Sequence, residues 1–428
     1  MSFFTGGIHP SFNKVQDSIE VAKIPRRVIL PLSQHIGAPC EPLVKIGDTV
    51  KIGQKIAQSN KFISAPIHSS VSGIVTEISV KPHPVLNKCV AVVIESSGPL
   101  EWDNSVKKRE DIDSLENVEL VKIINNAGIV GLGGAAFPTH VKLSPPPGKR
   151  IDTVILNGAE CEPYLSCDHR LMLEKTEEVL KGFLLIKKIL KSRNAVIGTE
   201  QNKENSAAFF RNKITELGGK VGVQVLETKY PQGSEKMLIY AMTQRKVPAG
   251  GLPLDIGCLV INVQTAKAVY DAVYEGKPLI ERVITIAGGV NKPKNILVKI
   301  GTPFKELIEE CGGSKGQIGK IISGGPMMGI SQYTDEVPVI KGTSGILVQL
   351  KNEINLENAG DCIRCSRCVD ACPMNLMPNI ITRLTKNDLI KQAQNFYPKD
   401  CFECGCCSYV CPSKIPLVHY IKLAKSSI

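Results

Sequence analysis

The chain has 428 residues, 43% of them hydrophobic, and 52 basic against 41 acidic side chains give it a net charge of +11. That length exceeds what one hydrophobic core organises and predicts about three or four domains. The N-terminus lacks a basic stretch followed by an apolar core, and Ile123–Val141, the longest segment free of charged residues, contains Asn, His, Pro and Gly. We therefore expect a soluble cytoplasmic protein without a secretory signal or a membrane span. Dispersed lysines and 5% aromatic residues make nucleic acid an unexpected partner.

Residues 1–100 predict an N-terminal β barrel-sandwich module. The pattern VKIGDTVKIGQKIA followed by SAPIHSSVSGIVTEI resembles the half-barrels of biotinyl and lipoyl carrier domains. Lys61 stands where those domains carry a modifiable lysine, but the flanking methionines are missing, so we expect a structural module. The expected strands, separated by Gly, Pro and Ser turn signals, are Val28–Leu30, Leu43–Ile46, Val50–Ile56, Val71–Ile78 and Val90–Ile94.

Residues 113–280 alternate between helical and strand patterns, which predicts a Rossmann-like α/β domain with a largely parallel sheet. The expected helices are Ser114–Asn126, Thr176–Lys191 and Asn205–Leu217. The expected strands are Thr153–Leu156, Ala195–Ile197, Val223–Leu226 and Leu259–Ile261.

The remaining chain predicts two smaller modules. Residues 281–352 read as a small α+β unit with one helix at Pro303–Cys311. Residues 353–428 are rich in cysteine, and the apolar spacing across Met377–Phe396 predicts one helix between two cysteine runs. The fold class is therefore a multidomain α/β protein with a helical C-terminal domain.

The two cysteine runs carry the strongest chemical signal. Nine of the 15 cysteines lie between Cys362 and Cys411, in two copies of CxxCxxCxxxCP. In two-cluster proteins the last cysteine of each run ligates the other cluster. The spacing therefore predicts two [4Fe-4S] clusters, the first held by Cys362, Cys365, Cys368 and Cys411, and the second by Cys401, Cys404, Cys407 and Cys372. Zinc, which also takes four thiolates, is the alternative, and Cys406 is an extra thiol without an assigned role.

A glycine-rich loop and an acidic segment predict a nucleotide or flavin site. The loop GLGGAAFP begins at Gly131, and glycines let backbone amides approach a phosphate or a flat ring. It follows a helix rather than a strand, so the GxGxxG match alone is weak. The segment NGAECEP begins at Asn157, at the carboxyl end of an expected parallel strand, where ligands bind in open α/β sheets.

Together these motifs resemble a known family. GLGGAAFPTHVKL and NGAECEP look like the flavin-binding region of the NADH-oxidising subunit of respiratory complex I. The whole chain is more similar to the RnfC family of the Rnf electron-transport complex, through FFTGGIHP, PLSQHIGAPCEP, GAECEPYLSCDHRLM, SGGPMMG and the double cysteine motif, in that order. The resemblance implies non-covalent FMN, NAD(H), two [4Fe-4S] clusters and a β-grasp (SLBB) module at 281–352.

The resemblance also implies which residues contact the cofactors. The glycines would line the isoalloxazine and phosphate, Phe137 the nicotinamide or adenine, and Lys142 the FMN phosphate. Ala159 and Ser234 depart from acidic residues of the complex I relative, which leaves individual flavin contacts open. The implied FMN and NAD(H) residues are Gly131, Gly133, Gly134, Phe137, Lys142, Asn157, Glu160, Glu162, Gly233, Glu235 and Asn262.

The implied activity is that of an oxidoreductase subunit without acid–base catalytic residues. Hydride would pass between NAD(H) and FMN, and single electrons between FMN and the clusters. The implied partners are other Rnf subunits, integral-membrane and ferredoxin-like ones among them, which would hold the chain peripherally at the cytoplasmic face of the bacterial inner membrane and use the energy to export Na⁺ or H⁺. The alternatives are a corrinoid reductase subunit of a bacterial microcompartment and a non-redox zinc scaffold.

Overall fold

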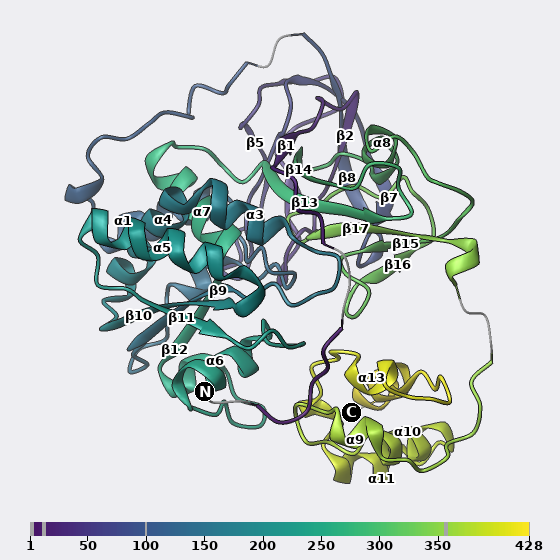
Figure 1. The fold of residues 1–428 in the computed structure, drawn as a ribbon. Coiled ribbons are helices and arrows are strands. Elements are labelled where there is room, and N and C mark those ends of the chain that lie inside the picture. The colour runs from purple at the N-terminus through teal and green to yellow at the C-terminus, as the bar shows by residue number, and fades with distance from the viewer. Residues whose placement is uncertain (1–3, 11–13, 99–100, 355–357, 428) are drawn as a thin grey trace.

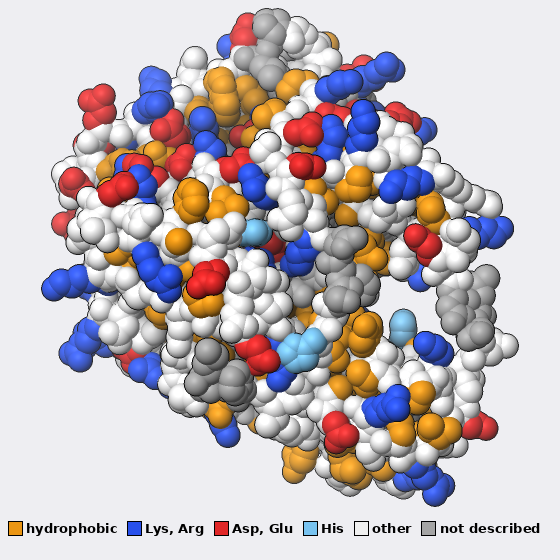
Figure 2. All heavy atoms as spheres, in the orientation of Figure 1, with side chains coloured by type: hydrophobic (Ala, Val, Ile, Leu, Met, Phe, Trp, Pro, Cys, Tyr) orange, Lys and Arg blue, Asp and Glu red, His pale blue; other side chains and the backbone are white. Residues whose placement is uncertain are grey.

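The computed structural model describes residues 4–10, 14–98, 101–354 and 358–427. Figure 1 shows an α/β lobe, two β-rich modules beside it, and a small helical domain that touches the rest of the molecule through few segments. Within the described ranges, no helix is long and apolar enough to cross a membrane. Basic and acidic side chains are interspersed on the face shown in Figure 2, so the net charge of +11 does not gather there into one patch.

The N-terminal barrel module packs two small antiparallel sheets around an apolar core. One sheet has the order β2 (Arg27–Pro31), β8 (Asn87–Ser96), β7 (Gly73–His83), β4 (Thr49–Val50). The other has the order β3 (Glu41–Pro42), β5 (Lys55–Gln58), β6 (Ile67–His68).

Two of the strand predictions for this module, Leu43–Ile46 and Val50–Ile56, were wrong. Residues 43–46 form no strand, because only the Leu43 N–H continues the pairing, to the Ile56 carbonyl at 2.8 Å. Residues 50–56 are split by a tight turn at 51–54, where Gly53 takes a φ of +85° that favours glycine. A break at a glycine inside an apolar run is invisible to hydrophobic patterning alone.

The α/β domain is built on one parallel sheet with helices on both faces, as predicted. The strand order is β11 (Gly222–Leu226), β10 (Asn194–Glu200), β9 (Thr153–Gly158), β12 (Cys258–Asn262). Val154 and Leu156 of β9 pack toward one face, and Ile155 packs toward the other with α6 (Glu235–Thr243). In Figure 1 the four longest helices of the domain lie on the face opposite α6: α1 (Asn117–Asn126), α4 (Thr176–Leu190), α5 (Glu204–Leu217) and α7 (Val263–Tyr274).

The β-grasp module is a mixed sheet covered by α8 (Phe304–Glu310). Its edge strand β1 comes from the N-terminal segment and pairs parallel to β14, so segments far apart in the sequence share one sheet. The order is β1 (Glu20–Val21), β14 (Lys294–Lys299), β13 (Glu281–Gly288), β17 (Gly345–Leu350), β15 (Ile318–Ser323), β16 (Ile330–Gln332).

The cysteine-rich domain, residues 358–427, consists of short helices around an apolar core. The single helix expected at 377–396 was wrong, because the chain breaks at Asp388, whose φ of +58° lies in the left-handed region that Asp tolerates. The helices are α9 (Arg367–Asp370), α10 (Pro378–Lys386), α11 (Ile390–Ala393), α12 (Cys406–Tyr409) and α13 (Leu417–Ser426).

An N-terminal strap, residues 4–9, runs between the α/β domain and the cysteine-rich domain (Figure 1). Ile8 forms a backbone pair with Tyr230 on one side, and the Gly7 N–H donates to the Ala371 carbonyl at 2.9 Å on the other. Gly6 has a φ of +70°, and a Cβ there would lie 2.7 Å from the Cys372 backbone, so only glycine fits. The strap therefore ties the two domains together.

Candidate cofactor site

The parallel sheet has its topological switch point between β9 and β12. From β9 the chain proceeds to β10 on one side, and β12 is added later on the other side. Ligands of open α/β sheets bind outside the carboxyl ends of strands at such a point. Asn157 and Asn262 are register partners there, which brings two of the predicted cofactor residues together.

The glycine loop, residues 131–137, lies over this point. It is closed by hydrogen bonds from the Gly131 N–H to the Phe137 carbonyl at 2.8 Å and from the Ala136 N–H to the Gly131 carbonyl at 3.1 Å. A Cβ on Gly133 would lie 3.4 Å from the Asn262 Cβ, whereas a Cβ on Gly134 would meet nothing. The loop thus presents exposed backbone at Gly133 and Gly134, as a cradle for a flat ring or a phosphate requires.

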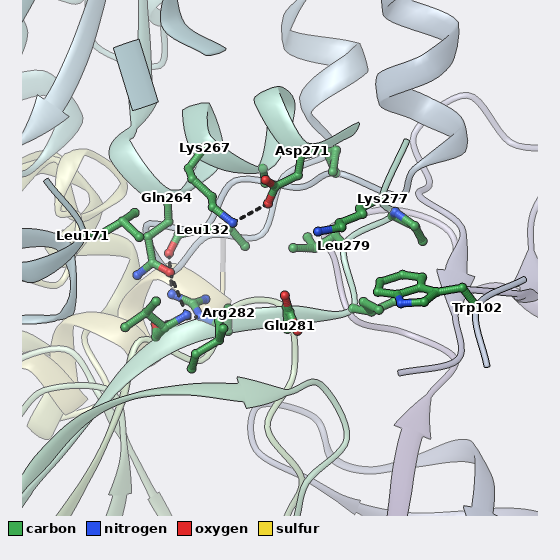
Figure 3. Close-up of a pocket in the computed structure, with 16 residues that line it drawn as sticks. Trp102, Leu132, Leu171, Gln264, Lys267, Asp271, Lys277, Leu279, Glu281 and Arg282 are labelled. Carbon is green, nitrogen blue, oxygen red and sulfur yellow. Dashed lines mark hydrogen bonds and ion pairs between the residues drawn. The ribbon is translucent and has the colours of Figure 1, made fainter. Parts of the chain in front are cut away.

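Buried side chains behind the loop fix its position. The Leu132 N–H donates to the Thr265 hydroxyl at 2.8 Å, and Arg282 donates from Nη2 to the Leu132 carbonyl at 3.1 Å. Figure 3 shows Arg282 and Gln264 pointing toward each other beneath the ion pair of Lys267 and Asp271. The cavity among these side chains has a volume of about 40 Å³, enough for a water molecule and far too small for a cofactor. This region supports the loop and does not bind FMN.

Polar side chains at the switch point are held in one network. Asn157 donates to the Gly233 carbonyl at 2.8 Å, and Asn262 donates to Asp168 Oδ2 at 2.6 Å. Gln264 donates to the other Asp168 oxygen at 2.8 Å. Burial, together with the nearby Glu160, raises the pKa of Asp168 to about 6. Asp168 was not predicted from the sequence as a site residue. It lies in the motif GAECEPYLSCDHRLM, but its contact with Asn262 joins two distant parts of the chain, which the motif does not reveal.

Lys142 and Glu235 form an ion pair beside the same edge of the sheet. Their side chains are partly exposed and lie 3.0 Å apart, and Lys142 also donates to the Val260 carbonyl at 3.3 Å. Glu235 begins α6, whose N-terminal amides favour an anion. A cation and a helix N-terminus at one edge fit the phosphate of FMN.

The two glutamates of NGAECEP point to different partners. Glu160 accepts from the backbone N–H groups of Asp168 and His169, at 2.8 and 3.0 Å, at the start of α3 (Cys167–Glu174). Glu162 accepts from the N–H groups of Met327 and Met328, at 3.2 and 2.9 Å. Burial raises the pKa of Glu162 to about 7.

A cavity of about 670 Å³ lies beside the glycine loop. Of the residues predicted to contact the cofactors, Gly133, Gly134 and Glu162 line it. Its other walls come from barrel residues 33–37 and 83–86 and from β-grasp residues 323–330 and 340–344. The volume is that of a cofactor pocket, and three modules contribute to it.

The predicted cluster ligands converge at two places in the cysteine-rich domain. Cys362, Cys365, Cys368 and Cys411 line one small cavity, in which Cys362 and Cys365 are exposed. The second set is more buried: burial, with the neighbouring thiols of Cys404, Cys401 and Cys372, raises the pKa of Cys407. Two groups of four converging thiols fit two cubane clusters.

Tyr230 and Cys406 contact the second set of cysteines. The Tyr230 hydroxyl donates to the Cys404 carbonyl at 2.7 Å, and Cys406 is buried and hydrogen-bonded through its thiol to Cys404. The tyrosine lies in YPQGSEKML, three residues before Gly233, which was singled out as a cofactor residue. Tyr230 was missed because its partner lies in a different domain.

Known families match successive parts of the chain. An RnfC barrel sandwich hybrid domain matches residues 2–99, and a Nuo51 FMN-binding domain matches residues 124–271. An SLBB domain matches residues 283–331, and a 4Fe-4S dicluster domain matches residues 361–415. These matches confirm the predicted fold class, the order of its modules, and FMN and iron–sulfur clusters as cofactors.

Several curated relatives align along nearly the whole chain. The RnfC relative from Clostridium ljungdahlii, part of a proton-translocating ferredoxin:NAD(+) oxidoreductase complex, is 50% identical, over 99% of this chain and 93% of the relative. The counterpart from the Na(+)-translocating complex of Acetobacterium woodii is 44% identical, over 99% and 97%. An NAD+-reducing [NiFe]-hydrogenase structure shares the fold, with a TM-score of 0.52 at 13% identity over 72% of this chain and 66% of that chain. The chain therefore belongs to the RnfC family, whose members are subunits of ion-translocating ferredoxin:NAD⁺ oxidoreductase complexes.

Proposed function

We propose that this chain is the RnfC subunit of a multi-subunit, ion-translocating ferredoxin:NAD⁺ oxidoreductase complex. It exchanges hydride between NAD(H) and FMN and transmits single electrons through two [4Fe-4S] clusters. The observation that carries this proposal is the glycine loop lying over Asn262, at the switch point between the neighbouring strands β9 and β12. That position supports a flavin site rather than a structural turn.

Each part of the site has a role in this activity. The backbone of the loop at Gly131, Gly133 and Gly134 and the side chains of Asn157 and Asn262 hold the flavin ring and ribityl chain, and Lys142 neutralises the phosphate. Phe137, Glu160, Glu162, Gly233 and Glu235 complete the FMN and NAD(H) contacts. FMN, when bound, supplies hydride exchange with NAD(H) and one-electron exchange with the clusters. Hydride transfer needs no acid–base catalyst, so the role of the protein is to position the two rings and to exclude water.

The cysteines hold the clusters in the pairing predicted from their spacing. Cys362, Cys365, Cys368 and Cys411 ligate one cluster, and Cys401, Cys404, Cys407 and Cys372 ligate the other. The convergence of each set of thiols supports this pairing.

The partners follow from the same activity. Ion translocation requires integral-membrane subunits, and ferredoxin oxidation requires a ferredoxin-like electron carrier next to this chain. We propose that the chain binds peripherally, through those subunits, at the cytoplasmic face of the inner membrane. The named relatives are subunits of such complexes, which supports this assembly.

One set of spectra tests the proposal. The purified chain should contain about eight irons with acid-labile sulfide, show flavin absorbance, and give cluster EPR signals after reduction. NADH should bleach the flavin band, and Gly133→Val should lose FMN because its side chain would crowd Asn262. Gly219→Val, at a turn with room around it, is the matched control and should keep FMN. Zinc without flavin would contradict the proposal and favour a scaffold, whereas NADH-dependent reduction of a corrinoid would favour a corrinoid reductase.

A further inference from the structure

The N-terminal strap lies along the segment that carries one of the predicted cluster ligands. The Gly7 N–H donates to the Ala371 carbonyl at 2.9 Å, and the Thr5 hydroxyl donates to the Asn375 side chain at 3.0 Å. Cys372, a predicted ligand of the second cluster, lies between these two contacts in the chain. The motif FFTGGIHP, which supplies the strap, has no part in the cofactor site described above. Its contacts therefore call for a role of their own.

Gly6 brings the strap into direct contact with Cys372. A Cβ on Gly6 would lie 2.7 Å from both the carbonyl carbon and the carbonyl oxygen of Cys372, so no side chain fits between the strap and that backbone. Gly6 also has a φ of +70°, a conformation that favours glycine. The strap thus approaches this cluster ligand as closely as only a glycine allows.

Ile8 adds an apolar side chain next to the same set of cysteines. It is 7% exposed and belongs to one group of packed apolar residues with Tyr230, Ala371, Cys404 and Cys406. Its backbone forms a reciprocal pair of hydrogen bonds with Tyr230, at 2.8 and 2.9 Å, which holds the side chain in place. The strap therefore contributes apolar cover as well as backbone contact.

The two sets of cluster ligands differ in exposure. Cys372, Cys404 and Cys407 of the second set are buried, whereas Cys362 and Cys365 of the first set are exposed. The strap packs on the second set, so its cover coincides with the set that is shielded from solvent. The two clusters would consequently lie in surroundings of different polarity.

Solvent exposure changes the potential of a cluster because reduction adds a negative charge. Water stabilises the added charge, so burial disfavours the reduced state and lowers the reduction potential. We propose that the N-terminal strap excludes water from the second cluster and thereby lowers its reduction potential. The inference rests on the proposed function, which assigns [4Fe-4S] clusters to these cysteines. The strap is then part of the electron-transfer machinery and not only a tie between two domains.

The test is a redox titration of the full chain with both clusters loaded, monitored by EPR. Gly6→Ala should lift the strap from Cys372 and admit water to the second cluster. At a fixed ambient potential near the midpoint, the ratio of reduced to oxidised second cluster should rise about tenfold, which is about 59 mV for a one-electron couple. The potential of the first cluster should stay unchanged.

Gly98→Ala is the matched control for this variant. Gly98 has a φ of +69°, close to the +70° of Gly6, but a Cβ there would meet nothing within 4 Å. Both variants therefore introduce similar backbone strain, and only Gly6→Ala adds a clash with the backbone of a cluster ligand. Gly98→Ala should leave both potentials unchanged.

A second variant covers the case in which Gly6→Ala fails to fold or to load its clusters. Ile8→Ala keeps the backbone hydrogen bonds with Tyr230 and removes only part of the apolar cover, so the same ratio should rise about threefold. Ile308→Ala is its control, because Ile308 is 5% exposed and packs in the core of the β-grasp module, away from the two cysteine runs. This control should change neither potential.

Two results would overturn the inference. One is an unchanged potential of the second cluster in every strap variant that retains both clusters. The other is an equal shift of both clusters, which would indicate a general loosening of the domain. If the unmodified chain held no iron–sulfur cluster, the proposed function itself would fail.

Discussion

The Tyr230 hydroxyl donates a hydrogen bond of 2.7 Å to the carbonyl of Cys404. Tyr230 belongs to the α/β domain and is 1% exposed, while Cys404 belongs to the second cysteine run. Cys161 and Met327 pack around the same contact, and a Cβ on Gly405 would lie 2.9 Å from the Met327 carbonyl. The flavin-binding side of the molecule therefore meets the second cysteine run, whereas Cys362 of the first run is exposed.

This contact predicts the order of the clusters in electron transfer. The cluster of Cys401, Cys404, Cys407 and Cys372 should exchange electrons with the flavin, and the other should exchange them with the partner. We call the cluster next to the flavin the inner cluster and the one ligated by Cys362, Cys365, Cys368 and Cys411 the outer cluster. With Cys365→Ala, NADH should still reduce the inner cluster, as measured by EPR of frozen samples. With Cys401→Ala, NADH should no longer reduce the outer cluster, although dithionite should. Equal reduction of the outer cluster by NADH in the unmodified chain and in Cys401→Ala would refute this order.

Tyr230→Phe should loosen the contact between the two domains. The change removes the donor and leaves the Cys404 carbonyl buried without it, at a cost of about 1 kcal/mol. Hydrogen exchange at residues 401–407 should accelerate by roughly fivefold, because the docked state is destabilised. Tyr397→Phe, in the same domain as Cys404 but exposed, is the control and should leave exchange at these residues unchanged. Protection equal to that of the unmodified chain would mean that this hydrogen bond does not hold the two domains together.

The sequence predicted what local patterns encode and missed what distant contacts decide. The strand expected at Thr153–Leu156, observed as Thr153–Gly158, follows from its apolar pattern, and the glycine loop follows from glycine placement. By contrast, the break at Asp388 follows from a left-handed backbone conformation that no periodicity reports. Gln34 and His35 lie far from the glycine loop in sequence, so only the packing of three modules reveals their place on the cavity wall.

The same limit applies to charged residues. The acidic pair of NGAECEP suggested that both glutamates face the flavin, which stays a prediction. The Glu160 carboxylate is engaged by the α3 N-terminus and that of Glu162 by the Met327–Met328 backbone, two contacts made with different modules. A short motif cannot distinguish these environments, because they depend on chain segments more than a hundred residues away in the case of Glu162.

Glu162 should make the stability of the cofactor-free protein fall as pH rises. Burial raises its pKa to about 7, above the unfolded value of 4.5, so the folded state retains a proton that the unfolded state releases between these values. Its contribution is full below about pH 4.5 and is lost as pH rises through 7, a change of about 2 kcal/mol between pH 5 and pH 8. Glu162→Gln should remove this part of the pH dependence, measured by urea unfolding at both pH values.

The control for this experiment is Glu353→Gln. Glu353 also accepts a backbone N–H, from Leu350 at 2.9 Å, but it is exposed. Its variant should keep the pH dependence of the unmodified chain. If Glu162→Gln also kept this pH dependence, the titration of Glu162 would not be its cause.

Lys341 should act in the opposite direction, because burial lowers its pKa to about 7. It is 1% exposed and donates from Nζ to the carbonyls of Pro66 in the barrel and Gly128 in the α/β domain, at 2.6 and 2.7 Å. The unfolded lysine keeps its proton up to about pH 10.5, so between pH 7 and that value the unfolded state binds more protons. Stability should therefore rise with pH across this window, by about 2 kcal/mol from pH 7 to pH 9.

Lys341→Met tests this by removing both the titration and the bridge between modules. The variant should be less stable than the unmodified chain at pH 9, because the two carbonyls lose their donor, and its stability should not rise from pH 7 to pH 9. The fluorescence of Trp102, the chain's single tryptophan, follows urea unfolding where it packs on Gly53 of the barrel. Lys51→Met, at an exposed lysine of the barrel, should retain the rise. A rise in Lys341→Met equal to that of the unmodified chain would assign the effect to another group.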